Sequence, residues 1–253
     1  DRATRRGRIA AALNWLALYH RRRGELDTAL ALGERSVTLV RGGRPGWVLW
    51  VQAALATTLL DLGNMTRAAQ LLSPLAESLL RTGFVPTPPW NTELVINMPL
   101  ALWCLGFPDQ ALKLGRAAQE MILCTRDKMQ IGIDVLVTCG AVLAPHRLRR
   151  EVEGVERGLR FVQPIVDEHR CSPIGETIVA MNQGWVCAQR GLWEQGIAGM
   201  RRTCSAWSRI QIRGRPYLKG LIAEALGRAG RPHEGLVYLE SALKQVERTN
   251  ERW

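Results

Sequence analysis

Apolar residues recur at helical spacing along nearly the whole chain, in paired amphipathic segments separated by a glycine. Ile9, Leu13 and Leu16 mark the first segment, and Ala29 and Leu32 begin the apolar row of its partner. Such a row, three to four residues apart, predicts a helix with one buried face. Glycine between two such segments predicts a sharp reversal, because glycine tolerates the left-handed backbone that ends many helices. The pattern therefore predicts helical hairpins.

The hairpins form a repeat. Turn glycines fall at positions 24, 63, 106, 191 and 230, so the spacings are 39, 43, 85 and 39 residues. The gap of 85 is about twice the others and predicts a degenerate copy that reverses near Ala144, Pro145 and His146. A fixed period of this length is typical of repeat arrays whose units stack on their neighbours. We expect an all-α, right-handed α-solenoid of about six hairpins forming one array over 1–253, with units at approximately 8–43, 47–82, 90–125, 128–168, 174–212 and 216–249.

Small residues accompany each glycine at two fixed places, seven before it and five after it. These positions hold Ala17, Ala56, Pro99, Gly184 and Ala223, and Ala29, Ala68, Ala111, Gly196 and Gly235. Close helix crossings need small side chains, so we expect Ala29, Ala68, Ala111 and Ala223 to be buried. Pro99 is the one departure. Pro108 and Pro232 stand at the first position of a return helix, where proline is well tolerated.

These glycines and small positions make the chain resemble a long-period, tetratricopeptide-like repeat domain. Segments such as 101–112 and 225–236 are similar to the C-terminal arms of bacterial signal-transduction ATPases, transcription activators and nucleotide cyclases. The resemblance covers the chain except the return helix of the fourth unit. It implies a tetratricopeptide-like fold and a regulatory, non-catalytic role.

Motifs for catalysis and for metal or cofactor binding are absent. The sequence contains no phosphate loop, no His-Glu-x-x-His and no Gly-x-Ser-x-Gly. Its four histidines are scattered, and its six cysteines include no Cys-x-x-Cys pair, which favours buried thiols in a reducing cytoplasm. No stretch is long and apolar enough for a membrane span. We therefore expect a cytoplasmic protein that is not an enzyme and has no metal site or cofactor.

The candidate binding surface follows from the resemblance. In tetratricopeptide-type folds, certain first-helix positions line the concave surface, and Trp50, Trp103 and Trp185 fall on them, whereas Trp15 and Trp193 are expected to fill space between helices. A groove of this kind suits a protein, a peptide or a small effector. The alternative is that the superhelix winds tightly and buries these positions. The full set of candidate groove residues is Asn14, Trp50, Asp61, Glu93, Trp103, Met181, Trp185, Gln189, Tyr217, Glu224 and Arg228.

The net charge of +11 adds nucleic acid to the candidate partners. Most basic residues are arginines, and an arginine cluster near the end of the fifth unit suits phosphate, which makes a nucleic-acid-binding helical repeat the alternative function. A solvated charged face, or the arginine bias of a GC-rich genome, explains the same residues without a ligand. The alternative basic patch comprises Arg201, Arg202, Arg209, Arg213 and Arg215.

The sequence thus favours a sensor or protein-interaction arm of a larger bacterial signalling or transcription-regulating ATPase. The lack of an initial methionine and the final residues 251–253 suggest a piece of a longer polypeptide. The apolar helix from Leu236 to Val246 is expected to present an uncovered C-terminal edge through which copies self-associate. A scaffold without any ligand is the third interpretation.

Overall fold

The fold is an all-α solenoid of helical hairpins, seen in a computed structural model that describes residues 2–43, 45–82, 92–124, 138–169, 173–210 and 214–252. No strand occurs within these ranges. The helices are α1 (Arg2–Arg22), α2 (Leu26–Val40), α3 (Pro45–Asp61), α4 (Met65–Thr82), α5 (Thr92–Cys104), α6 (Pro108–Cys124), the π-helical η2 (Thr138–Leu143), α8 (Ala144–Leu148), α9 (Val152–His169), α10 (Pro173–Gln189), α11 (Trp193–Ile210), α12 (Arg215–Arg228) and α13 (Pro232–Thr249).

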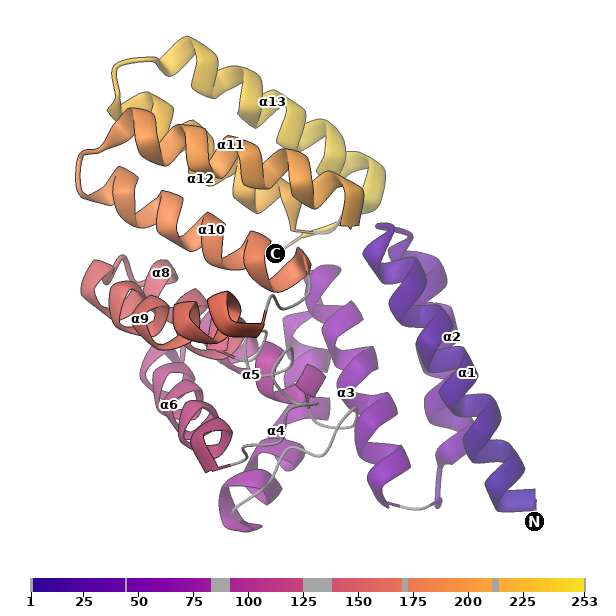
Figure 1. The fold of residues 1–253 in the computed structure, drawn as a ribbon. Coiled ribbons are helices and arrows are strands. Elements are labelled where there is room, and N and C mark those ends of the chain that lie inside the picture. Colours follow the sequence, from indigo (N-terminus) through magenta and orange to yellow (C-terminus); the bar gives the residue numbers. More distant parts are fainter. Residues whose placement is uncertain are drawn as a thin grey trace.

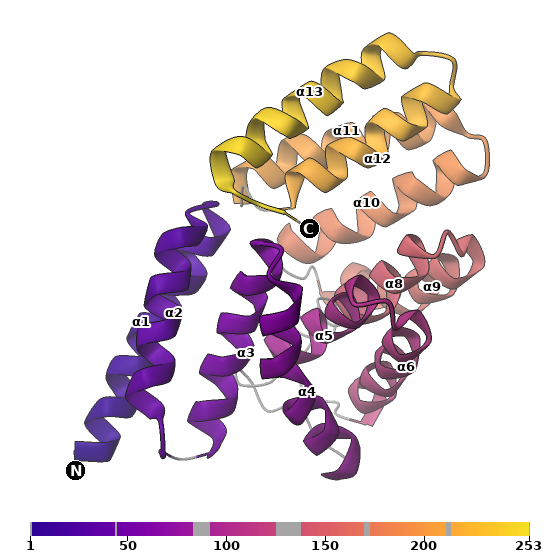
Figure 2. The same ribbon diagram turned by 180° about the vertical axis from the view of Figure 1, so that it is seen from behind.

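Neighbouring helices pack as antiparallel pairs, and each pair packs on the next. The pairs are α1–α2, α3–α4, α5–α6, α8–α9 with η2 before it, α10–α11 and α12–α13. First helices of successive pairs also contact one another, as in α1–α3, α3–α5, α5–α8 and α10–α12, and we call them the first-helix layer. The row of pairs curls round until the C-terminal end lies beside the end of α3 (Figures 1 and 2).

Each reversal uses the same hydrogen-bonded turn. At the first one, the amide of Gly24 donates to the Arg21 carbonyl and the amide of Glu25 donates to the His20 carbonyl. This pair of bonds is the Schellman motif, which satisfies the last carbonyls of a helix and needs a left-handed residue. The five predicted turn glycines adopt that conformation, with φ between 75° and 87°.

The fourth reversal is not where the sequence pattern placed it. Ala144, Pro145 and His146 begin α8, and the turn lies at Arg150, which takes the left-handed conformation with φ of 61°. Its amide donates to the Arg147 carbonyl, and the amide of Glu151 donates to the His146 carbonyl, so the Schellman motif is preserved. The prediction was wrong because it looked for a breaker, whereas here an arginine occupies the glycine position.

The helix crossing in the fourth pair also departs from the repeat pattern. Leu143 and Val155, both buried, stand at the two positions that are small in most other pairs. Gly154 and Gly158 supply the missing space, because a Cβ at Gly154 would overlap the His146 ring and one at Gly158 would overlap the Leu143 side chain. In this pair, large side chains therefore occupy the positions that are small in most other pairs, and glycines at neighbouring positions make room for them.

Replacing Arg150 with glycine is expected to stabilise the array. A non-glycine residue in the left-handed region is disfavoured by roughly 1–2 kcal/mol, and the loss of the ion pair between the half-exposed Arg150 side chain and Glu224 offsets only part of that gain. We expect the free energy of unfolding in urea to rise by about 1 kcal/mol. Arg157→Gly is the control, because Arg157 is exposed within α9 and glycine there should cost about 1 kcal/mol. Equal losses in the two variants would contradict the assigned turn.

The small residues at the other crossings are buried as expected. Ala29, Ala68 and Ala111 are fully inaccessible and Ala223 is 6% exposed, which confirms the predicted close contacts. Pro99 also lies buried, inside α5. Pro108 and Pro232 begin α6 and α13, as the pattern predicted.

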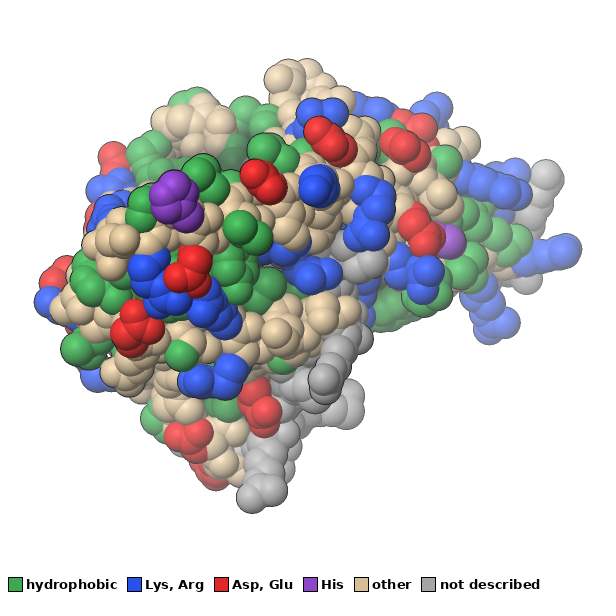
Figure 3. Space-filling view, turned by 90° about the horizontal axis from the view of Figure 1, so that it is seen from above, with side chains coloured by type: hydrophobic (Ala, Val, Ile, Leu, Met, Phe, Trp, Pro, Cys, Tyr) green, Lys and Arg blue, Asp and Glu red, His purple; other side chains and the backbone are tan. Residues whose placement is uncertain are grey.

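The two end helices keep apolar side chains on the surface. On α13, Leu236, Val237, Leu239 and Leu243 are exposed, and on α1 so are Ile9, Leu16 and Tyr19. Seen from the α13 end, apolar side chains lie among interleaved basic and acidic ones (Figure 3). Self-association through the α13 face stays an expectation, which sedimentation at high concentration would test.

Candidate functional site

The predicted groove residues all lie on helices of the first-helix layer, but five of them are buried. Trp50 and Trp185 are 2% and 1% exposed, so their rings are packed within the array and not displayed on an open surface. Asn14, Asp61 and Met181 are also buried; Trp103, Gln189, Tyr217 and Glu224 are half-buried; Arg228 is exposed; and the side chain of Glu93 lies outside the described residues. Tight winding, the alternative interpretation, accounts for the buried members.

An aromatic cluster explains the burial of Trp50. Its ring lies between Trp15 and Trp47, with centroids 5.8 Å and 6.0 Å away. Trp15, which the sequence interpretation assigned to filling space between helices, is 55% exposed. The half-buried Trp193 packs against the apolar core of the C-terminal pairs, as a space-filling ring should.

A buried ion pair joins the first two pairs. Arg21, at the end of α1, donates from Nε to Asp61 Oδ2 at the end of α3 over 2.6 Å, and both side chains are at most 6% exposed. Removing either partner would leave a charge with little solvent contact. Asp61 therefore acts as a structural tie in the first-helix layer.

A second polar group lies on the first-helix layer of the last three pairs. Arg147 on α8 is buried and donates from one terminal nitrogen (NH1) to Asn182 Oδ1 on α10 over 2.6 Å. Its Nε donates to the Tyr217 hydroxyl on α12 over 3.2 Å, and its guanidinium lies 5.3 Å from the centre of that ring. One arginine thus connects three successive pairs.

Arginines and a glutamate continue this group toward the surface. Glu224 on α12 accepts from Arg150 over 2.8 Å and from Arg228 over 3.1 Å, and Arg228 also donates to Gln189 over 3.2 Å. The side chains of Arg150 and Arg228 are about half exposed. We call the following residues the inner cluster: Arg147, Arg150, Asn182, Gln189, Tyr217, Glu224 and Arg228.

The inner cluster is positively charged, since it holds three arginines and one carboxylate. Guanidinium groups have more donors than these partners use, so Arg150 and Arg228 can donate further hydrogen bonds to acceptor atoms of a bound molecule. The sequence interpretation placed four of its members in the groove and did not place Arg147, Arg150 or Asn182 there.

A short motif in the sequence could have revealed them. Residues 20–25 read His-Arg-Arg-Arg-Gly-Glu and residues 146–151 read His-Arg-Leu-Arg-Arg-Glu. In both copies the histidine Nδ1 contacts the glutamate, and the arginine two residues before the glutamate donates to it. Burial alone would raise the pKa of Glu151, but the bonds from Arg149 and His146 outweigh it and lower that pKa. Aligning the copies places Arg147 opposite Arg21 and Arg150 opposite Gly24.

The alternative basic patch is divided among different environments. Arg201 donates to Glu234 and lies 5.5 Å from the Tyr238 ring centre, while hydrogen bonds from Arg231 and Arg201 lower the pKa of Glu234. Arg202 is exposed and Arg215 is half-buried. The side chain of Arg209 and the whole of Arg213 lie outside the described residues.

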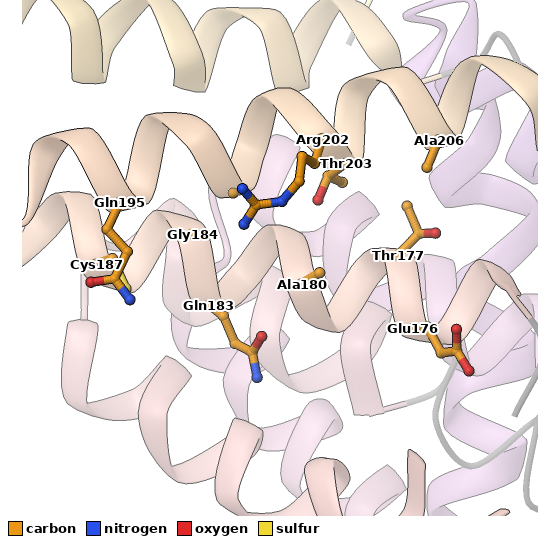
Figure 4. Close-up of a pocket in the computed structure, with 11 residues that line it drawn as sticks. Glu176, Thr177, Ala180, Gln183, Gly184, Cys187, Gln195, Arg202, Thr203 and Ala206 are labelled. Carbon is orange, nitrogen blue, oxygen red and sulfur yellow. The ribbon is translucent and has the colours of Figure 1, made fainter. Parts of the chain in front are cut away.

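Arg202 lines a cavity of about 330 Å³ between α10 and α11 (Figure 4). Ala180, Gly184 and Gly199 leave room there, and the buried Thr203 hydroxyl lines it. Residues 176, 180, 183 and 187 line the cavity, whereas Met181, Trp185 and Gln189 lie on another face of α10. The cavity is therefore separate from the inner cluster.

Within the described ranges, no group of three or more histidine, cysteine, aspartate or glutamate side chains could hold a metal ion. In the same ranges, no helix is both long and apolar enough to cross a bilayer.

Comparison with known proteins identifies the fold only. No protein-family model matches the chain, and no curated protein matches it by sequence. Among solved structures, it is similar to a Rap protein complexed with competence and sporulation factor, with a TM-score of 0.70 and 8% sequence identity, covering 94% of this chain and 74% of that one. The chain therefore shares its helical-repeat architecture with that protein.

Proposed function

We propose that this chain is a non-catalytic binding arm whose first-helix layer, at the inner cluster, holds an extended peptide or a segment of a partner protein. The observation that carries the proposal is the placement of Arg150 and Arg228 on one face, half exposed and sharing one carboxylate. Each guanidinium group is held in place by Glu224 and is half exposed to solvent. Guanidinium groups placed in this way can donate hydrogen bonds to the carbonyl and carboxylate oxygens of a peptide. The half-buried Tyr217 ring adds apolar contact beside them.

The similarity to a Rap protein supports a partner-binding role. That structure contains competence and sporulation factor, so an array of this architecture can hold a partner. The sequence resemblance adds the finer proposal of an arm in a larger bacterial signalling or transcription-regulating ATPase. A partner that binds one state of the arm better than another would then bias the attached domains.

Selection from a phage-displayed library of random peptides tests the binding proposal. We expect enriched sequences whose affinity falls about tenfold, or 1.4 kcal/mol, in Arg228→Gln and in Tyr217→Ala. Arg190→Gln is the matched control, because Arg190 is equally exposed and, like Arg228, bonds two side chains, here Glu153 and Glu156, but lies outside the inner cluster. Affinity measured by calorimetry should be unchanged in that control.

Two outcomes would overturn the proposal. The first is that no peptide is enriched, and the second is that Arg228→Gln and Arg190→Gln bind equally well. Nucleic-acid binding, the alternative, predicts that log affinity for single-stranded RNA falls with log salt by about 0.7 per phosphate contacted. The division of the basic patch, with Arg201 already paired to Glu234, disfavours that function.

A further inference from the structure

We infer that residues 250–252 form an intramolecular latch that joins the last helix pair to the second one and holds the curled array closed. In a simple solenoid each unit contacts only its neighbours. Here the chain leaving α13 reaches the turn between α3 and α4, and both views place the C-terminal end beside α3 (Figures 1 and 2). The latch is a property of the free chain and does not depend on the proposed ligand.

Asn250 turns the chain toward the second pair. It ends α13 in the left-handed conformation, with φ of 57°, and its amide donates to the Val246 carbonyl over 2.8 Å. Its side-chain oxygen accepts a hydrogen bond from Arg252 Nε over 3.1 Å. Asparagine is among the residues that adopt this conformation most readily, so the residue type at position 250 favours the direction in which the segment leaves α13.

Glu251 anchors the latch to its own helix pair. Its side chain is buried, with 3% of the residue exposed, and Oε1 accepts a hydrogen bond from the Gly214 amide over 2.9 Å. Gly214 precedes α12, where amides lack partners within the helix and negative charge is favourable. A buried carboxylate at this place fixes the segment relative to α12.

Arg252 makes the long-range contact. Its backbone amide donates to the Asp61 carbonyl at the end of α3 over 2.7 Å. Its Cβ lies so close to Gly63 that a Cβ added there would be 2.7 Å away. Because Asp61 also holds Arg21, the latch connects the sixth pair to the first two pairs together.

We expect the latch to open and close. Among the described residues, the contact includes one backbone hydrogen bond and one close approach, on a segment anchored by Glu251. A molecule that binds the open array better than the closed one can shift such an equilibrium by its difference in affinity. Such a molecule would release the latch and separate the sixth pair from the second.

Gly63→Ala tests the latch, with Gly191→Ala as the matched control. Both glycines occupy the left-handed position of a hairpin turn, with φ of 75° and 82°, so alanine introduces the same backbone strain. An added Cβ meets Arg252 at Gly63 but meets nothing within 4 Å at Gly191. We expect only Gly63→Ala to increase the radius of gyration in X-ray scattering and to speed amide exchange at Arg252 by about tenfold or more.

A rescue variant separates opening from misfolding. Gly63→Ala combined with Arg252→Gly removes the clashing Cβ while keeping the amide that donates to Asp61, so compactness and slow exchange should return. Glu251→Ala should speed exchange at Arg252 and Gly214 with Gly63 intact. The inference is overturned if Gly63→Ala and Gly191→Ala give equal radii and equal exchange, or if the double variant is no more compact than the single one.

Discussion

Gly196→Ala is expected to destabilise the array by about 3 kcal/mol, because an added Cβ would overpack the crossing of α10 and α11. That Cβ would lie 2.6 Å from the Ala188 nitrogen and 2.7 Å from the Gly184 carbonyl oxygen. Both are backbone atoms, so rotating a side chain cannot relieve the overlap and the helices must separate. The free energy of unfolding in urea measures the effect.

Gly220→Ala is the control, with an expected effect of opposite sign. Gly220 lies within α12, and a Cβ there meets nothing within 4 Å. Alanine should therefore stabilise the helix by about 1 kcal/mol through its higher helix propensity. If Gly196→Ala were also neutral or stabilising, the close crossing of α10 and α11 would be wrong.

The contrast between these glycines shows what the sequence could predict. Gly196 stands at a fixed distance from a turn glycine, as Ala29 and Ala68 do, and these positions share one physical requirement in most pairs. The helices of a hairpin and the crossing between them depend on residues close together in the sequence, so both could be inferred from the sequence pattern. Arg150 was not predicted as a turn residue, because an arginine stands there in place of the usual glycine. Only the similarity of residues 146–151 to residues 20–25 indicates the turn.

The candidate site was harder to predict, because burial depends on how tightly the whole array curls. Trp50 and Trp185 stand on first helices at positions that sequence alone could place either in a groove or in the interior. The contact of Arg252 with Asp61 spans most of the chain and has no periodic signature. Nor does the pairing of Arg147 with Asn182 follow from either residue type, since Arg21 at the equivalent position pairs with a carboxylate.

That difference between Arg21 and Arg147 leads to a second large expected effect. Arg21→Met should lower the free energy of unfolding by about 3–5 kcal/mol, because it leaves the buried Asp61 carboxylate without its cation. Arg147→Met is the matched comparison, since its partners Asn182 and Tyr217 are neutral and no charge is stranded. We expect a cost of about 1.5 kcal/mol there.

A compensating variant decides whether the stranded charge causes the loss. Arg21→Met combined with Asp61→Leu replaces the ion pair with apolar groups, and such replacements are often neutral or stabilising. Denaturant unfolding of the double variant should therefore recover most of the stability that Arg21→Met loses. If the double variant were as unstable as the single one, the loss would come from the packing of the Arg21 side chain, and the buried ion pair would not be what ties the first two helix pairs together.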